Sequence, residues 1–238
     1  DQKYGALKER LERMNIFWSA RPTSWDDVRN NRNALLAESD WTQLADAQVS
    51  LSEEQKQKGI VAYSSGNHGQ AVAFASFNHG IEATIVMPEN ASTVKVAATS
   101  GYGASILLSG SNYDESYSKA VSITKKSSAT MIHPFDDPLV IAGQGTIGLE
   151  ILNSLKNVDV IIAPVGGGGL ISGLALALKE KHPNIKIIGV QSSSMSSMLE
   201  SKKNKKLTTV ASRFTIADGI DVKTPGELTF KIIDTIID

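Results

Sequence analysis

The amino-acid sequence predicts an α/β protein whose open parallel sheets carry helices on both faces. Between residues 58 and 190, apolar runs of four to seven residues alternate with longer segments whose apolar residues recur at helical spacing. The apolar runs are bounded by turn residues, which is typical of parallel strands buried on both faces. Because right-handed helical crossovers join such strands, the helices cover the two faces of an open sheet.

The expected elements alternate in a regular order. We expect strands at 59–63, 82–87, 104–108, 130–133, 158–164 and 185–190, and helices at 69–78, 91–100, 113–126, 139–155 and 170–181. Four strands fall in a small domain, placed at 42–147, and two in part of a larger domain at 148–238. The lysine-rich run 202–206 is expected to be a solvated loop.

The first 41 residues differ in composition from the rest. All three tryptophans and five of the six arginines lie there. We interpret 1–41 as a helical segment of different origin, chance in a short stretch being the alternative. Residues 32–44 are similar to a motif of phage tail-fibre assembly proteins.

Composition excludes several classes of function. The net charge of −1 gives no basic excess for binding nucleic acid. No apolar run reaches the ~20 residues that span a bilayer, so we expect no membrane partner. The absence of cysteine excludes thiolate metal sites, and the four histidines lack metal-ligand spacing, so no metal site is expected. A cytoplasmic location fits this composition.

A polar loop, Ser64–Gln70, follows the first expected strand and opens the next helix. Ligands of α/β proteins bind at the carboxyl ends of strands, and a helix N-terminus attracts a carboxylate or phosphate. Hydroxyls of Ser64 and Ser65 and the amide of Asn67 add hydrogen bonds. The alternative is a structural N-cap with a turn glycine, and the residue types alone leave both open.

Four consecutive glycines, Gly166, Gly167, Gly168 and Gly169, join the strand at 158–164 to the helix at 170–181. Glycines let several backbone N–H groups approach one anion closely. The alternative is a flexible linker, but linkers seldom join a buried strand to an amphipathic helix, so phosphate binding is favoured. Two other glycine-containing segments do not by themselves indicate a binding site. Asp218-Gly219 is typical of a turn, and 141–146 of a packing segment with close backbone approach.

Together these segments resemble the fold type II pyridoxal-phosphate enzymes, whose fold is that of the tryptophan synthase β chain, and in particular threonine ammonia-lyase (threonine dehydratase) and serine racemase. The matching segments follow the family's order and spacing over residues 58–238, and the last favours the ammonia-lyase. They are 63–75, 80–92, 101–110, 133–152, 158–173 and 215–230.

The resemblance implies a role for each candidate residue. Gly166, Gly167, Gly168 and Gly169 would hold the phosphate of the pyridoxal phosphate cofactor, Asn67 would bond the 3′-oxygen of its ring, and Gly219 would line the ring. Ser64, Ser65, Asn67 and His68 would bind the substrate carboxylate. Ser65 matches the acid/base of the racemase. In the implied reaction, a small hydroxy amino acid loses its Cα proton and its β-hydroxyl as water, takes up water again, and is released as a 2-oxo acid and ammonia.

The chain departs from the family in three places. The family's Schiff-base lysine would fall at or near Asp40, yet no lysine lies between Lys8 and Lys56. Lys56 and Lys58 fall in a polar run that we interpret as solvated. The family continues beyond the position of Asp238, so we expect an incomplete larger domain, and 191–197 lacks the racemase's metal-binding carboxylates.

Two hypotheses follow from these departures. The chain is either an active lyase that obtains its lysine from elsewhere, or a catalytically inactive chimera or truncated homologue that keeps a cofactor-binding scaffold. The missing lysine favours the second. Uncovered sheet edges or faces in either case predict a homo-oligomer.

Overall fold

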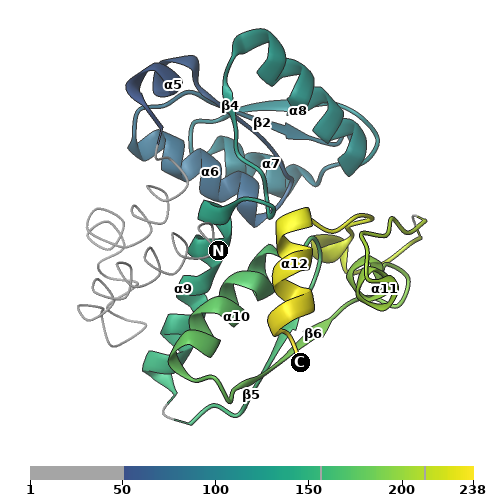
Figure 1. Ribbon diagram of the computed structural model, residues 1–238. Helices are drawn as coiled ribbons and strands as arrows, with labels where there is room; N and C mark the ends of the chain where they lie inside the picture. Colours follow the sequence, from purple (N-terminus) through teal and green to yellow (C-terminus); the bar gives the residue numbers. More distant parts are fainter. Residues whose placement is uncertain (1–50, 156, 212) are drawn as a thin grey trace. The chain divides into compact units, whose positions relative to one another are not determined.

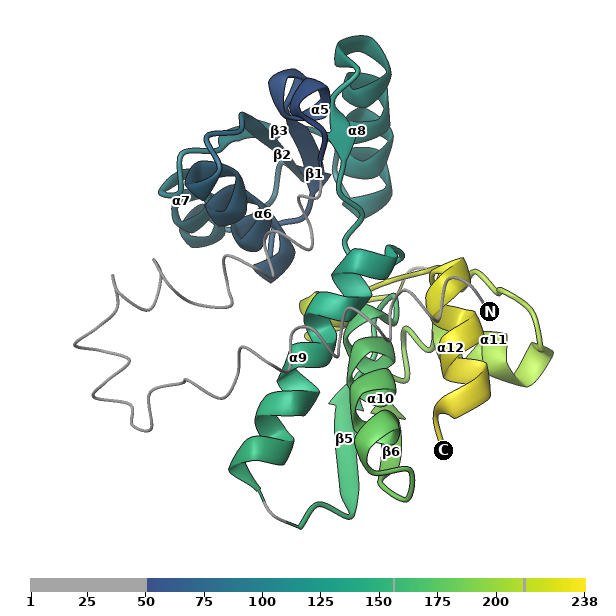
Figure 2. The ribbon, with the colours of Figure 1, turned by 60° about the vertical axis from the view of Figure 1, so that its left-hand side comes forward.

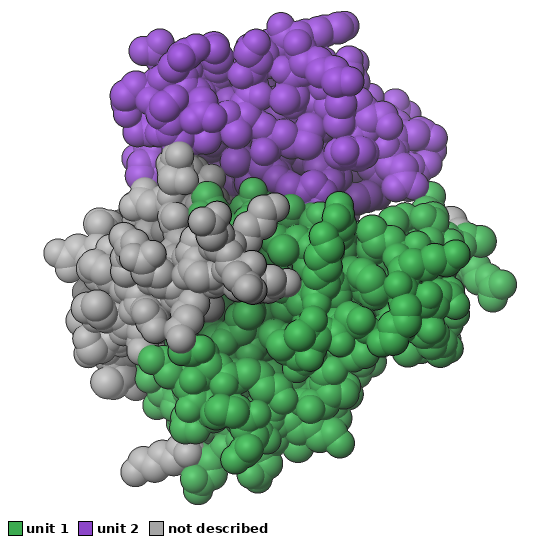
Figure 3. All heavy atoms as spheres, viewed as in Figure 1, with its two compact units in different colours: residues 1–22, 135–238 green, residues 23–134 purple. Residues whose placement is uncertain are grey.

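A computed structural model describes residues 51–155, 157–211 and 213–238 (Figure 1). The expected segment 1–41 and the position of Asp40 lie outside these residues. The chain divides into two compact units between Pro134 and Phe135 (Figure 3). We call the described residues 51–134 the first unit (purple, unit 2 in the key of Figure 3) and those from 135 to 238 the second unit (green, unit 1 in that key). No helix of the described residues is long and apolar enough to cross a membrane.

The first unit is built on a four-stranded parallel sheet in the order β3-β2-β1-β4. The strands are β1 (Ile60–Tyr63), β2 (Ala83–Met87), β3 (Ser105–Leu108) and β4 (Thr130–Met131). Ile60 pairs with Ala83 on one side and Thr130 on the other. All four residues of β1 are buried, as expected for an apolar run at the centre of a parallel sheet.

Four helices accompany this sheet: α5 (Glu53–Lys58), α6 (Asn67–Asn78), α7 (Thr93–Ser100) and α8 (Tyr113–Ser127). Helices α6 and α7 lie on one face and α8 on the other (Figure 2). Val61, Tyr63 and Val86 form a buried cluster with Ala120 of α8. The predicted helices on both faces are therefore confirmed in this unit.

The second unit holds a two-stranded parallel sheet in which Val160 pairs with Lys186. Its elements are α9 (Pro138–Ser154), β5 (Val160–Pro164), α10 (Gly169–Lys181), β6 (Lys186–Val190), α11 (Ser197–Asn204), a 3₁₀ turn η2 (Asp218–Ile220) and α12 (Glu227–Ile236). The core of this unit packs against Ala163 and Ile187. Val160 and Ile162, which alternate with the covered positions of β5, are 47% and 67% exposed. The expectation that this strand is buried on both faces is wrong, because among the described residues only one of its faces is covered.

The backbones of helices α9 and α10 pack against each other so closely that there is no room for a side chain at Gly173. A Cβ atom on Gly173 of α10 would overlap the carbonyl oxygen of Ile141 and lie 2.6 Å from the backbone nitrogen of Gly145. The interpretation of 141–146 as a packing segment is thus confirmed. This packing holds α9 in the second unit. Residues 135–147, which the sequence assigns to the small domain, belong to the same compact unit as α10.

Three helices had no expected counterpart. Helix α5 has no buried residue, and its Lys56 and Lys58 form ion pairs with Glu53 and Glu54, which agrees with their interpretation as solvated. Helix α11 extends into the lysine-rich run, so the prediction of a loop from 202 is wrong for its first three residues. Helix α12 lies in a segment without an expected element, and its buried residues face α9 and α10.

Candidate functional site

The loop after β1 turns sharply into α6. Ser64 N donates to the Val86 carbonyl at 3.1 Å and so extends the parallel pairing by one residue. The Ser64 hydroxyl then accepts a hydrogen bond from Gly66 N at 3.1 Å. A Cβ atom on Gly69 would lie only 2.5 Å from the Ser64 carbonyl oxygen. Only glycine allows the first turn of α6 to pack this closely on the end of β1.

The N-terminus of α6 is open to an anion. Gly66 occupies its N-cap without a side-chain hydrogen bond, and the first turn carries no acidic residue. Within the described residues, the backbone N–H groups of Asn67, His68 and Gly69 have no acceptor. Asn67 is exposed, and Ser64 and Ser65 are partly buried. Free N–H groups, a positive helix end and nearby hydroxyls suit a carboxylate.

His68 points toward β4. Its Nε2 lies 3.2 Å from the Ile132 carbonyl oxygen, and because a carbonyl only accepts, Nε2 carries a hydrogen. Burial lowers the pKa of His68 to about 4, the Ile132 carbonyl acts in the opposite direction, and His133 adds a smaller lowering. His68 is therefore neutral near pH 7 and supplies no positive charge to a substrate.

The neutral state of the partly buried His68 predicts an acid-sensitive fold. Because its pKa lies below the ordinary value of 6.5, the unfolded chain binds the proton more tightly, so His68's contribution is complete above pH 6.5 and is lost as the pH falls toward 4. We expect the free energy of unfolding in urea to fall by about 2 kcal/mol between about pH 7.5 and about pH 4.5. His68→Gln, which can still donate to Ile132, should lose this part of the pH dependence. An equal dependence in both proteins would contradict the assignment.

Aromatic residues pack around Tyr63, the last residue of β1 before the Ser64–Gln70 loop. The Tyr63 hydroxyl lies 3.0 Å from His133 Nε2, and the ring of Tyr63 packs against Tyr113 and Tyr117 at centroid distances of 5.0 and 4.8 Å. Burial is the main cause of a raised pKa for Tyr113, which keeps it uncharged. These contacts tie the carboxyl end of β1 to β4 and α8.

The glycine loop joins β5 to α10 in the second unit. Gly168 has a φ of +105°, and its Cβ would lie 2.8 Å from Thr229. A Cβ on Gly167 would overlap the Phe135 ring, and one on Gly169 would lie 2.9 Å from the Phe135 Cβ. Neighbouring side chains thus leave no room for a Cβ at Gly167, Gly168 or Gly169, and only glycines fit there.

The backbone of this loop offers hydrogen-bond donors. Within the described part of the chain, the backbone N–H groups of Gly166, Gly167, Gly168 and Gly169 have no hydrogen-bond acceptor. The Gly167 carbonyl, in contrast, accepts from Gly226 N at 3.2 Å and from the Thr229 hydroxyl at 2.6 Å. Unused N–H groups at the N-terminus of a helix form a phosphate-binding arrangement. The residues present therefore fit a phosphate group.

The turn at Asp218–Ile220 lies beside this loop. A Cβ on Gly166 would be 3.1 Å from Ile220 Cα, whereas one on Gly219 would meet no atom within 4 Å. Gly219 is exposed and borders open space. Its expected place beside a cofactor ring stays a prediction.

The structure places the candidate residues in two groups. Ser64, Ser65, Asn67 and His68 belong to the first unit, and the four glycines and Gly219 to the second. The first group follows β1 and the four glycines follow β5, so both loops lie at the carboxyl end of a strand, where the sequence predicts ligand-binding loops. Gly219 lies in the turn η2 instead.

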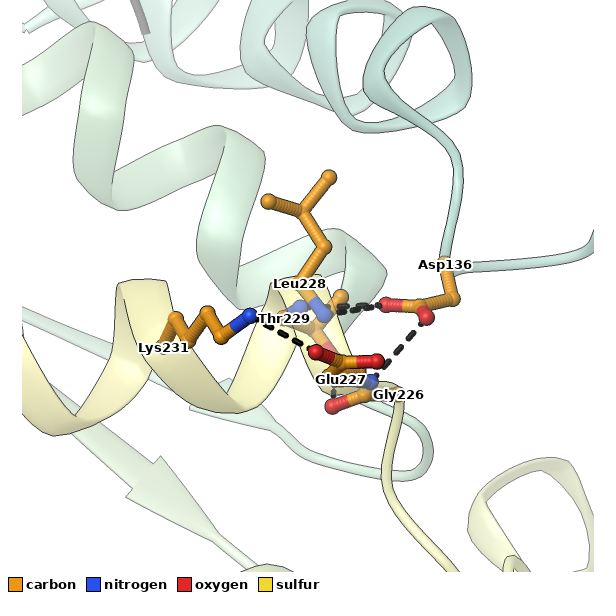
Figure 4. Close-up of polar contacts among 6 residues, drawn as sticks. All are labelled: Asp136, Gly226, Glu227, Leu228, Thr229 and Lys231. Carbon is orange, nitrogen blue, oxygen red and sulfur yellow. Dashed lines mark hydrogen bonds and ion pairs between the residues drawn. The ribbon is translucent and has the colours of Figure 1, made fainter. Parts of the chain in front are cut away.

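Sequence reasoning missed the residues that support the glycine loop. Phe135 packs on it, and Asp136 accepts hydrogen bonds from the first turn of α12 (Figure 4). The next residue, Asp137, caps α9 ahead of a proline, which is a recognisable local signal. Asp136 lies 91 residues from Glu227, and no local pattern announces a cap across such a separation.

Comparisons with known proteins agree with this geometry. The family model described as "Pyridoxal-phosphate dependent enzyme" matches residues 37–238. The L-threonine ammonia-lyase of Thermotoga maritima is 50% identical over 188 residues, which are 79% of this chain and 47% of that protein. The chain spans about half the length of the curated relatives it matches.

Solved structures are similar in fold. The processed form of threonine deaminase isoform 2 from Solanum lycopersicum is 40% identical with a TM-score of 0.77, over 83% of this chain and 58% of that one. The serine racemase of Dictyostelium discoideum is 38% identical with a TM-score of 0.72, over 83% of this chain and 64% of that one.

Proposed function

We propose, because this chain belongs to the family of pyridoxal-phosphate dependent enzymes, that it has the cofactor architecture of a threonine or serine ammonia-lyase. One observation carries the proposal: among the residues that the structure describes, the backbone N–H groups of four consecutive glycines at the start of α10 have no acceptor. A loop of this kind suits a phosphate monoester. The high identity to an L-threonine ammonia-lyase supports a small hydroxy amino acid as substrate.

The chain's own residues would divide the work between the two loops. Gly166, Gly167, Gly168 and Gly169 would bind the phosphate. The Asn67 amide would orient the ring through its 3′-oxygen, and the N-terminus of α6 with Ser64 and Ser65 would bind the substrate carboxylate. Pyridoxal phosphate, when bound, supplies an electron sink for the bond broken at Cα. Ser65 would hold a proton at its Oγ on one face of the substrate.

A second candidate function follows from one sequence observation. No lysine lies between Lys8 and Lys56, and the resemblance would place the family's lysine at or near Asp40. A chain without that amine lacks the usual covalent anchor and the Cα base. The alternative is therefore a catalytically inactive scaffold that binds phosphate compounds without covalent attachment.

Two experiments distinguish the active lyase from the inactive scaffold: binding of a cofactor analogue, and borohydride trapping of a covalent cofactor adduct. We expect calorimetry to detect binding of 4′-deoxypyridoxine phosphate, an analogue without the reactive aldehyde, because this binding needs only the phosphate loop. We also expect borohydride reduction after incubation with pyridoxal phosphate to leave no stoichiometric lysine adduct in peptide mass spectra. One specifically labelled lysine would establish covalent attachment and overturn the inactive alternative. Failure of the analogue to bind would overturn the cofactor architecture itself.

Two further expectations accompany the proposal. Exposed Val160 and Ile162 on β5 support association with a second copy, since apolar surface of this kind favours contacts between chains. The cytoplasm, where the substrate and cofactor would be available, stays the expected location.

A further inference from the structure

Asp136 holds the start of α12 through three backbone hydrogen bonds. Its Oδ2 accepts from Glu227 N at 3.0 Å, and its Oδ1 accepts from Leu228 N at 2.9 Å and from Thr229 N at 3.1 Å (Figure 4). A helix leaves its first N–H groups without partners, and here a carboxylate from a distant segment receives them. Gly226 is packed so closely that a Cβ there would overlap Asp136 Oδ1.

The helix start held by Asp136 in turn holds the glycine loop. Gly226 N and the Thr229 hydroxyl both donate to the Gly167 carbonyl oxygen, at 3.2 and 2.6 Å. The Thr229 hydroxyl also lies 3.2 Å from the Gly226 carbonyl. A hydroxyl has one hydrogen, and the shorter distance directs it at Gly167. Thr229 is fully buried, so no water competes for this bond.

The orientation of the Gly167 carbonyl decides where the next N–H points. In a planar trans peptide, the carbonyl of Gly167 and the N–H of Gly168 project in opposite directions. Holding the carbonyl toward Thr229 and Gly226 therefore turns the Gly168 N–H away from α12, where it can donate to a bound anion. A peptide between two glycines rotates at low cost, and a rotated peptide would present a carbonyl oxygen, which repels an anion.

We propose that Thr229 and Asp136 are positioning residues that lock the Gly167–Gly168 peptide in its anion-binding orientation. Thr229 acts directly on the Gly167 carbonyl, and Asp136 acts through the first turn of α12. The inference rests on the proposed phosphate-binding role of the glycine loop. It adds two residues to that site, neither of which touches the phosphate.

Thr229→Val and Thr229→Ser form a matched pair of variants. Valine keeps the buried shape and removes the donor, whereas serine keeps the hydroxyl. We expect the Kd of 4′-deoxypyridoxine phosphate, measured by calorimetry, to rise about tenfold or more in Thr229→Val and to stay within about twofold in Thr229→Ser. Asp136→Asn should give an intermediate rise, because its amide cannot accept from all three N–H groups. Equal affinities in wild type and Thr229→Val would overturn the inference and leave the proposed function intact.

A measurement without ligand keeps the two proposals distinguishable. In ¹H–¹⁵N spectra of the ligand-free chain, we expect one sharp Gly168 amide signal in the wild type and in Thr229→Ser. In Thr229→Val the signal should broaden or double as the peptide rotates. An unchanged Gly168 signal in Thr229→Val would overturn the lock. If the lock is seen but the wild type does not bind the analogue, the phosphate role fails and the anion-binding part of the inference fails with it.

Discussion

Gly173→Leu is expected to prevent the second unit from folding, and Gly173→Ala to lower its free energy of unfolding by about 3 kcal/mol or more. Any Cβ at this position overlaps the Ile141 carbonyl oxygen and approaches the Gly145 nitrogen. Both are backbone atoms of α9, so relief requires the two helices to separate. Separation would open the contact that buries Ile141 and Leu174.

Urea unfolding followed by circular dichroism would measure this effect. Gly219→Ala is the matched control, because no atom lies within 4 Å of its Cβ position and its φ is not positive. We expect the control to change the free energy of unfolding by less than about 0.5 kcal/mol. A Gly173→Ala protein as stable as the wild type would show that α9 and α10 can separate without cost.

Gly167→Asp is expected to weaken binding of 4′-deoxypyridoxine phosphate at least about 100-fold. Two effects act together. The new Cβ overlaps the Phe135 ring, so the loop must shift, and the new carboxylate places a negative charge beside the donors that would bind the phosphate. Like charges in a partly buried site repel strongly.

Gly167→Asn separates the two effects, since it has nearly the same shape without the charge. We expect it to bind the analogue more weakly than the wild type but more tightly than Gly167→Asp, and the difference between the variants to shrink at high salt. Unfolding midpoints of all three proteins would show that each is folded. Wild-type affinity in Gly167→Asp would remove the glycine loop from the proposed site.

Local sequence patterns were sufficient for the elements that carry the two loops. The strand β1 and the loop that follows it were predictable because an apolar run, a turn and a helical pattern lie next to one another in the chain. The same holds for β5, the four glycines and α10. Helix α12 was not predicted although its apolar residues recur on one face, because its N-cap is Gly226, which has no capping side chain.

Burial on both faces was a weaker inference. The apolar run of β5 resembles that of β1, yet Val160 and Ile162 are largely exposed. An apolar run indicates that a strand can be buried, but the elements packed against the strand decide whether both of its faces are covered. The division of the chain between Pro134 and Phe135 has the same origin, since α9 joins the unit that its glycines contact.

The sequence by itself determined the α/β fold class, the order of the strands and of the helices between them along the chain, the two candidate loops and the family resemblance. All of these depend on residues that are neighbours in the chain or recur with the period of a strand or helix. Only the tertiary structure showed that Asp136 caps α12 and that Thr229 holds the Gly167 carbonyl. Such contacts join residues more than sixty positions apart, and a hydrogen bond across that separation leaves no periodic pattern in the chain.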